Sequence, residues 1–183
     1  LPIVRETGGL KDSVKKLSLV LALCLVVTLT ASAAGSGDAL SAAAALVGSD
    51  ASHILESKEL QPGSSVSDWA AFLAGSTGVE TEKEGYLRGL WSYVTRQYRE
   101  KGGFSETKAT DWHRISLAVL ALGADPTCFG RNAQGECVDL IADGTYDWSV
   151  TDEPGTQGLN GWIFSLITLD AMLYEVPAGS NFD

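Results

Sequence analysis

The sequence has few basic residues. It contains 13 lysines and arginines against 23 aspartates and glutamates, a formal net charge of −10 over 183 residues. Non-specific binding to nucleic acids or to anionic lipids requires clustered basic side chains, so this balance argues against both kinds of partner. A hydrophobic content of 45% and a charged content of 20% are those of an ordinary globular chain. The length allows one domain, or one domain with a tail.

The sequence also lacks the short motifs of common catalytic sites. It has no G-x-S-x-G motif and no strand to present a nucleophile, which leaves Ser-His-Asp catalysis without support. No glycine cluster follows a strand, so phosphate-binding loops and dinucleotide fingerprints are absent as well. His53 and His113 stand outside metal-ligand spacings such as H-x-x-x-H. We therefore expect no catalytic residue, no cofactor and no metal within this chain.

The N-terminal segment has the three parts of a secretory signal peptide. Lysines within residues 11–16 precede an uncharged apolar run over residues 17–30, which is followed by Ala-Ser-Ala-Ala. The apolar run is shorter than the roughly 20 residues that a membrane-spanning helix needs. An uncleaved membrane anchor is the alternative. We predict a secreted or cell-surface protein whose residues 1–34, with upstream translated sequence at their start, are removed by cleavage after Ala33 or Ala34.

Export changes the expected state of the cysteines. Cys24 lies in the signal segment, which leaves Cys128 and Cys137 as a pair in an oxidising compartment. The loop between them contains Gly130 and Gly135, which give it the flexibility to bring the two sulfurs together. We predict a disulfide between Cys128 and Cys137. Two free thiols are the alternative, because a short loop gains only modest chain-entropy stabilisation.

The hydrophobic pattern of the remaining chain predicts helices and no strands. Over residues 84–100 the apolar residues recur at three- and four-residue steps, with charged residues on the other face. Two segments, Ile115–Leu122 and Leu159–Tyr174, are apolar almost all round, which predicts helices buried on every side. This alternation indicates concentric helix layers or a solenoid, and an all-α fold. The predicted helices cover residues 38–47, 69–74, 80–100, 112–122, 138–143 and 157–174.

One stretch resembles a known repeat. A Gly-Gly-Phe turn at residues 102–104 precedes Thr107 and Thr110, and an apolar helix ending in Ala-Leu-Gly follows at residues 115–123. This order is similar to a repeat of the prenyltransferase and squalene-cyclase superfamily, also called the terpenoid cyclase superfamily. Gln157 to Trp162 resembles the Gln-to-Gly-Trp element of the same superfamily, with a compressed spacing.

Further segments resemble exported toroid-domain proteins of Gram-positive bacteria more closely. The resemblance implies an α/α-toroid, in which helix pairs wind into two concentric rings around a central cavity. It covers residues 66–177, which we expect to form a partial toroid, since a closed toroid needs more helices. Residues 35–65 are then a leader helix with a linker, and residues 178–183 begin a linker to a missing C-terminal part. The segments concerned are residues 67–72 (SDWAAF), 111–115 (DWHRI) and 157–170 (QGLNGWIFSLITLD).

Polar and aromatic residues at the starts of two helices are the candidate ligand contacts. In the fold that the resemblance implies, the N-termini of the inner helices line the cavity. The alternative for the first cluster is a cap made by Asp111 with packing of Trp112. For the second, it is hydrogen bonding of the polar side chains to a neighbouring loop. The candidates are Trp112, His113, Arg114, Gln157, Asn160 and Trp162.

Asp170 is a candidate for a buried ion pair. Leu166, Ile167 and Leu169 precede it closely, so the helix pattern places it in apolar surroundings. Because a buried carboxylate must be paired or neutral, Arg114 is its candidate partner.

The sequence predicts an exported, non-catalytic α/α-toroid module that binds a small molecule or a surface partner at the cell surface. The alternative is a terpenoid cyclase-like or prenyltransferase-like enzyme with its catalytic residues beyond Asp183. Residues 147–153 do not match the Asp-x-Asp-Asp cluster of the cyclases. A purely structural surface domain is a third reading. The expected partners include the C-terminal remainder of the same protein but no nucleic acid, and a membrane only through an uncleaved signal segment.

Overall fold

The computed structural model describes residues 37–56, 61–79 and 82–181. The predicted signal peptide, residues 1–34, lies outside the described residues. Within the described ranges the regular elements are all helices, which confirms the all-α prediction. Among these residues, no helix combines the length and the apolar character that crossing a bilayer requires.

The chain divides into two compact units, Leu1–Val47 and Gly48–Asp183. Of the first unit the structure describes residues 37–47, which belong to helix α2 (Gly37–Leu55). The second unit holds the end of α2 and the remaining helices. These are α3 (Ser65–Ser76), α4 (Lys83–Lys101), α5 (Thr110–Ala121), α6 (Leu140–Thr145) and α7 (Leu159–Asp170), with the 3₁₀ turns η2 (Pro126–Cys128) and η3 (Pro154–Gln157).

Local capping sets the ends of the helices in the second unit. Ser64 caps α3 by accepting a hydrogen bond from the Ser67 backbone N–H, so the helix begins earlier than the predicted start at residue 69. Glu82 caps α4 in the same way, through Gly85. The helix ends at Gly102, whose φ of 78° is the left-handed conformation that glycine adopts readily. These contacts fix where α3 begins and where α4 begins and ends.

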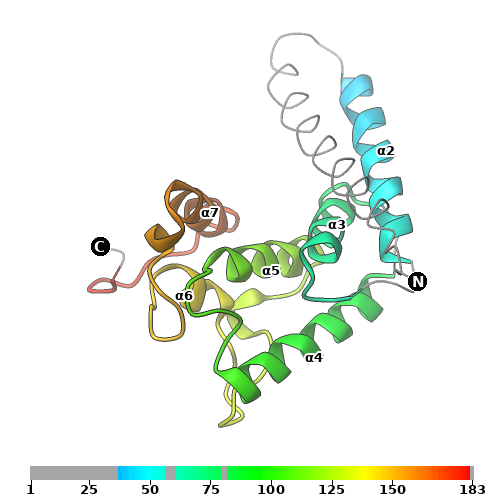
Figure 1. Cartoon of the computed structure of the whole chain (residues 1–183). Coiled ribbons are helices and arrows are strands. Elements are labelled where there is room, and N and C mark those ends of the chain that lie inside the picture. Colours follow the sequence, from blue (N-terminus) through cyan, green and yellow to red (C-terminus); the bar gives the residue numbers. More distant parts are fainter. Residues whose placement is uncertain (1–36, 57–60, 80–81, 182–183) are drawn as a thin grey trace, which may run out of the picture. The chain divides into compact units, whose positions relative to one another are not determined.

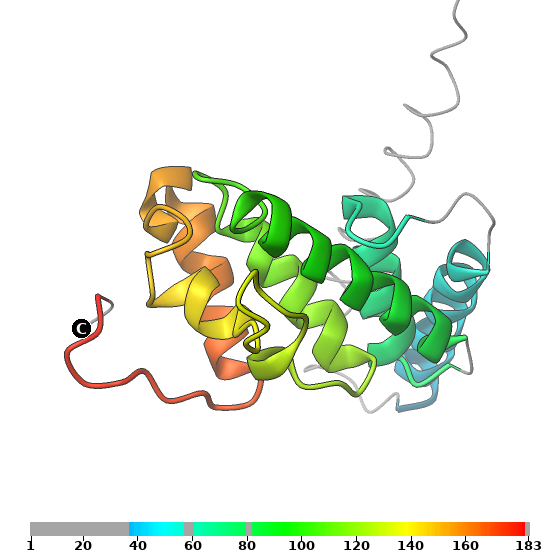
Figure 2. The ribbon, with the colours of Figure 1, turned by 90° about the horizontal axis from the view of Figure 1, so that it is seen from below.

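Helix α5 is the centre of the second unit. It packs against α3, α6 and α7, and Figures 1 and 2 show it surrounded by these helices and α4. Ile115, Ala118 and Val119 have no exposed surface, so the predicted burial of this segment is confirmed. The core that α5 organises also includes Leu90 and Val94 from α4.

Two glycines allow other elements to approach α5 closely. A Cβ atom on Gly75 of α3 would lie 2.3 Å from the backbone oxygen of Ala121. A Cβ atom on Gly144 of α6 would lie 2.5 Å from the Cβ of Trp112. Any larger residue at either position would separate α5 from its neighbour, because protein interiors are close-packed.

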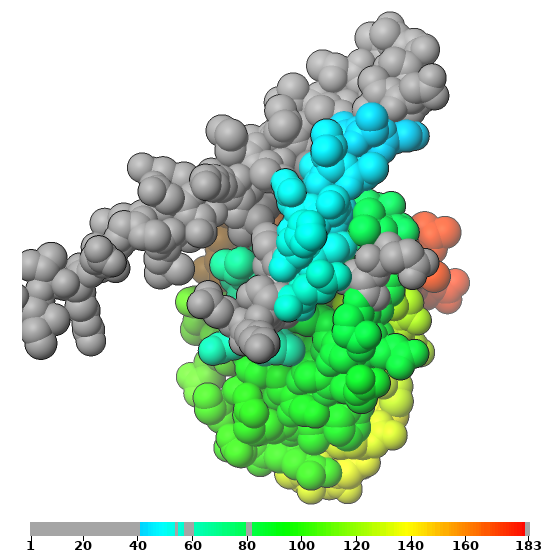
Figure 3. All heavy atoms as spheres, turned by 90° about the vertical axis from the view of Figure 1, so that its right-hand side faces the viewer, coloured from blue at the N-terminus to red at the C-terminus, as the bar shows by residue number. Residues whose placement is uncertain are grey.

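The predicted disulfide between Cys128 and Cys137 is confirmed. Its loop packs on α4, where the Arg131 backbone N–H donates a 3.1 Å hydrogen bond to the Thr95 hydroxyl. Figure 3 shows this loop, in yellow, beside α4, in green. The cross-link therefore closes a loop that covers one side of α4.

Helix α7 differs from its prediction in length and in burial. It ends at Asp170 rather than near Tyr174, and Leu173 beyond it has a φ of 55°. Its predicted burial on every side is wrong, because Leu159 is 73% exposed and Leu166 is 53% exposed. An almost uniformly apolar sequence does not indicate which face of a helix will meet the core.

Candidate functional site

A buried ionic network connects α3, α4 and α5. The Arg114 guanidinium donates to Asp68 through Nε at 2.9 Å, and through its other nitrogens to Asp111 and to the Gly63 carbonyl. The other oxygen of Asp68 accepts hydrogen bonds from the Tyr86 hydroxyl at 2.6 Å and from the Gly63 backbone N–H at 2.9 Å. Both the N–H and the carbonyl of Gly63 are thus held by this network.

The hydrogen bonds and ion pairs of this network compensate for the free-energy cost of burying the charges of Asp68 and Arg114. Burial raises the pKa of Asp68, while the Arg114 charge and the hydrogen bonds from Tyr86 and Gly63 oppose that rise. Burial acts to lower the pKa of Arg114, but the carboxylates of Asp68 and Asp111 outweigh it and hold the pKa above its usual value. Burial, followed by the Asp68 charge, raises the pKa of Tyr86, so its hydroxyl remains a donor.

The predicted ion pair between Arg114 and Asp170 is wrong. The partners of Arg114 are Asp68 and Asp111, and Asp170 is exposed at the end of α7. Asp111 pairs with Arg114 and does not cap α5, whose N-terminal Ala109 makes no side-chain cap. Of its apolar neighbours in sequence, Leu166 and Ile167 lie on a helix face that the core does not cover, whereas Leu169 is buried.

Trp112 and His113 point into the protein interior. The indole N–H of Trp112 donates a 2.6 Å hydrogen bond to the Tyr98 hydroxyl, and that hydroxyl donates to Asp143 at 2.5 Å. The ring of Trp112 also contacts Phe104, with centroids 4.8 Å apart. Trp112 therefore packs in the core, as its alternative interpretation expected.

His113 is a buried neutral histidine. Its Nε2 lies 2.6 Å from the Gly144 carbonyl and 3.1 Å from the Ser165 hydroxyl. Since a carbonyl only accepts, Nε2 carries the proton, and among the described residues Nδ1 has no hydrogen-bond partner. Burial lowers the pKa of His113 to about 4. The side chain thus connects α5 to α6 and α7 as an uncharged group.

The second predicted cluster also has structural roles. The Gln157 side chain accepts a 2.9 Å hydrogen bond from the Thr110 backbone N–H, so η3 caps the start of α5. Trp162 is half-buried against η3, where a Cβ on Gly155 would lie 2.6 Å from its indole nitrogen. Asn160 is exposed on the first turn of α7. Neither of the two hollows described below is lined by any of these residues or by Arg114.

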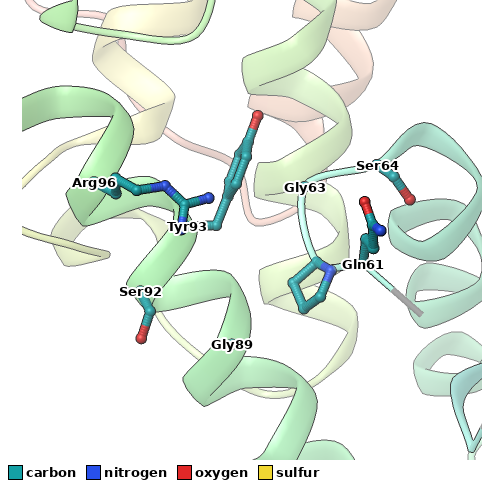
Figure 4. A pocket seen from close by; sticks show the side chains of 8 residues that line it. Gln61, Gly63, Ser64, Gly89, Ser92, Tyr93 and Arg96 are labelled. Atoms are coloured by element: carbon teal, nitrogen blue, oxygen red, sulfur yellow. The ribbon is translucent and has the colours of Figure 1, made fainter. Parts of the chain in front are cut away.

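A solvent-facing pocket of about 420 Å³ lies between residues 61–64 and α4. Figure 4 shows Tyr93 and Arg96 on the α4 side, with Gln61 and Ser64 across from them. The pocket is lined by Gln61, Pro62, Gly63, Ser64, Gly89, Ser92, Tyr93 and Arg96.

Two of the lining residues are glycines whose backbones lie against side chains. A Cβ on Gly89 would lie 2.8 Å from the Pro62 ring. Gly63 has a φ of 90°, and a Cβ there would lie 2.4 Å from the Tyr93 ring. The loop therefore approaches α4 closely at these points and leaves the pocket beside them.

The polar side chains that line the pocket differ in whether they already make hydrogen bonds or ion pairs within the protein. The Ser92 hydroxyl donates to the Arg88 carbonyl, and the Ser64 hydroxyl donates to Ser67. The Arg96 guanidinium lies 5.7 Å from the centroid of the Tyr93 ring. Among the described residues, no carboxylate lies within 4 Å of that guanidinium. Arg96 is thus a cation that faces solvent across a hollow and has no acidic partner within the part of the chain that the structure describes.

A second hollow of about 640 Å³ lies between the C-terminal part of α4, the disulfide loop and α6. Asp139, Asp143 and Asp147 line it, and each of them is engaged. Asp139 caps α6, Asp143 accepts from Tyr98, and Asp147 accepts from the Ser149 backbone N–H. Burial, together with the neighbouring carboxylates, raises the pKa of Asp143 to about 6. These contacts stabilise the fold locally.

None of the residues that line the pocket between residues 61–64 and α4 was among the predicted ligand contacts. Arg96 was assigned to the charged outer face of its helix, and residues 61–65 were assigned to a loop. The Pro62-Gly63 pair was the available signal, because such a dipeptide marks a tight turn.

Comparison of the chain with protein-family models, curated proteins and solved structures finds no match.

Proposed function

We propose that the chain is an exported, non-catalytic α/α-toroid module that binds a small anionic ligand in the pocket between residues 61–64 and α4. The observation that carries the proposal is the Arg96 guanidinium, which faces this pocket without an acidic partner among the described residues. Of the residues that line the pocket, Arg96 is the charged one. In a chain with a net charge of −10, such a cation gives the pocket a selective attraction for anions.

The floor of the pocket supports a binding role because it is held in place before a ligand arrives. Gly63 lines the pocket, and the buried pair of Asp68 and Arg114 fixes both of its backbone polar groups. A site whose wall is already ordered loses less conformational entropy on binding. The polar side chains of Trp112, His113 and Gln157 are engaged in contacts within the fold, which favours binding over catalysis.

The ligand test uses carboxylated probes. Glucuronate, galacturonate, N-acetylneuraminate and citrate are screened by thermal shift, and any hit is titrated by calorimetry. Replacing Arg96 with glutamine should weaken the best probe by about tenfold or more, since a charge-assisted bidentate hydrogen bond is lost. Arg88→Gln on the same helix is the matched control and should change affinity by less than about twofold. Equal binding by wild type and Arg96→Gln would place the ligand elsewhere.

Export has its own test. The disulfide between Cys128 and Cys137 supports an oxidising compartment. N-terminal sequencing of the secreted product should read from Ala34 or Gly35. A cytosolic product that still contains Lys16 would contradict the proposed export without affecting the pocket.

A further inference from the structure

Helix α7 has four of its large apolar residues on the solvent side. Leu159, Ile163, Leu166 and Ile167 are all exposed, and their spacing of four, seven and eight residues from the first places them on one face. The opposite face, which meets the core, carries Gly161, Ser165 and Thr168 together with Leu169. The inward face is thus mostly small and hydroxyl-bearing, while two leucines and two isoleucines point outward.

This surface lies at an edge of the second unit. Met172 and Leu173 continue it beyond the end of α7 and are also exposed. Helix α7 packs on α5, α6 and η3, and it forms an edge of the unit in both ribbon views (Figures 1 and 2). Six of the nine large apolar residues found exposed in the described structure belong to this face. A contiguous apolar surface of this kind marks an interaction site.

The acidic residues around this apolar face indicate which kind of partner it can bind. Residues 132–183 contain nine acidic residues and no lysine, arginine or histidine. Asp152 and Glu153 are exposed just before η3, and Asp170 and Glu175 are exposed at the other end of the helix. Carboxylates therefore border the apolar face at both ends. A partner that fits must present an apolar stripe with basic residues beside it.

We propose that the exposed face of α7 docks a basic amphipathic helix of another protein. A helix of this kind places its apolar stripe on Leu159, Ile163 and Leu166 and its lysines or arginines beside the bordering carboxylates. A second copy of this chain is a poorer fit. In an antiparallel pairing of two α7 helices, Asp170 of each copy would approach Asp152 and Glu153 of the other, and like charges oppose association. Anionic lipid is opposed for the same reason.

The test compares two synthetic helices that differ in charge alone. One is an 18-residue peptide with leucine on one face and lysine on the other, and the second has glutamate in place of every lysine. Fluorescence anisotropy with the exported chain should show the basic peptide binding about tenfold tighter or more, with the difference shrinking at high salt. Equal affinity for the two peptides would overturn the proposal.

Matched variants locate the binding. Leu166→Gln and Ile163→Gln alter exposed positions and should each weaken the basic peptide by about fivefold or more, with an unchanged circular dichroism spectrum. Leu46→Gln makes the same change at a leucine that is 71% exposed outside α7, and should have less than about a twofold effect. Loss of affinity in all three variants alike, or in none, would overturn the assignment to α7.

A different kind of partner on the exposed face of α7 would give different results in these experiments. Concentration-dependent dimerisation that Leu166→Gln abolishes would assign the face to a second copy. Preferential binding to phosphatidylcholine vesicles over the basic peptide would assign it to lipid. A longer form of the same protein that no longer binds the peptide would mean that its own remaining part covers α7. Each of these outcomes overturns the proposal. Arg96→Gln should leave peptide binding unchanged, so the proposal for the ligand pocket and the proposal for this surface are tested independently.

Discussion

Replacing Arg114 with methionine should destabilise the protein strongly. The substitution keeps an apolar stem and removes the guanidinium, whose side chain is 11% exposed. Asp68, which is completely buried, then retains hydrogen bonds from Tyr86 and Gly63 but has lost its counter-ion. Removing one partner of a buried ion pair costs about 3–5 kcal/mol, because the remaining charge is left uncompensated.

The expected loss of unfolding free energy is large relative to the total stability of a domain. Typical free energies of unfolding are about 5–15 kcal/mol, so Arg114→Met should remain folded with a much lower melting temperature. For a unit of this size the expected loss corresponds to a fall of about 10–20 °C. The Gly63 carbonyl also loses a donor, which should loosen the loop beside the pocket.

A double-mutant cycle separates the ionic effect from lost packing. Urea unfolding at pH 7, followed by circular dichroism, is measured for Arg114→Met, Asp68→Asn and the combined variant. The combined loss should be smaller than the sum of the single losses by about 1–3 kcal/mol, since the asparagine has no charge to compensate. Arg88→Met is the control, because Arg88 is 70% exposed and its pairs with Glu82 and Glu84 are worth about 0–1 kcal/mol. A loss below about 1 kcal/mol in Arg114→Met, or additivity in the cycle, would refute the reasoning.

Two further predictions concern packing and cross-linking. Serine at both Cys128 and Cys137 should lower the free energy of unfolding by about 2–3 kcal/mol in urea titrations, because the unfolded chain regains the freedom of the closed loop. Equal stability with and without the bridge would contradict this. Gly161→Ala should cost about 1–3 kcal/mol by the same measurement, since its Cβ would lie 1.8 Å from the Pro154 carbonyl oxygen. Gly85→Ala, where the new Cβ meets only the flexible end of Glu82, should be within about 1 kcal/mol of wild type.

The sequence predicted the helices well where local signals were strong. Helix α4 has three- and four-residue apolar spacing and a glycine stop at Gly102, and both features depend on neighbouring residues alone. The disulfide was predictable because a short loop joins its cysteines. The start of α3 was misplaced because residues 64–68 include three serines and an aspartate, each able to cap a helix, and the sequence does not rank them.

Pairings between distant elements were not predictable in the same way. Arg114 was identified as a candidate for an ion pair, but Asp68 lies 46 residues away, and no local pattern in the sequence pairs the two. Asp170 was chosen because apolar residues surround it, which indicates burial only if that helix face meets the core. The inward face of α7 carries Gly161, Ser165 and Thr168 beside Leu169, and the three small residues give no hydrophobic signal. Periodicity therefore located the helix and assigned its buried side incorrectly.

The two buried titratable groups beside Gly144 should respond to acid in opposite directions. The pKa of His113 is about 4 in the folded protein against 6.5 when unperturbed. Between these values the unfolded chain binds the extra proton, so stability is lost as the pH falls below about 6.5, by on the order of 3 kcal/mol in full. The pKa of Asp143 is about 6 when folded against 3.8 when unperturbed. Here the folded chain binds the extra proton, so stability is gained as the pH falls through 6.

Single variants should separate these opposing effects. His113→Gln retains a donor for the Gly144 carbonyl but does not titrate, so acidification from pH 7 to pH 4 should destabilise it less than wild type. Asp143→Asn retains an acceptor for Tyr98, and the same acidification should destabilise it more than wild type. The readout is the change in unfolding free energy across the pH range, which is independent of any constant packing loss in either variant. If both variants changed the pH profile in the same direction, the burial of His113 or the protonation of Asp143 in the folded state would be wrong.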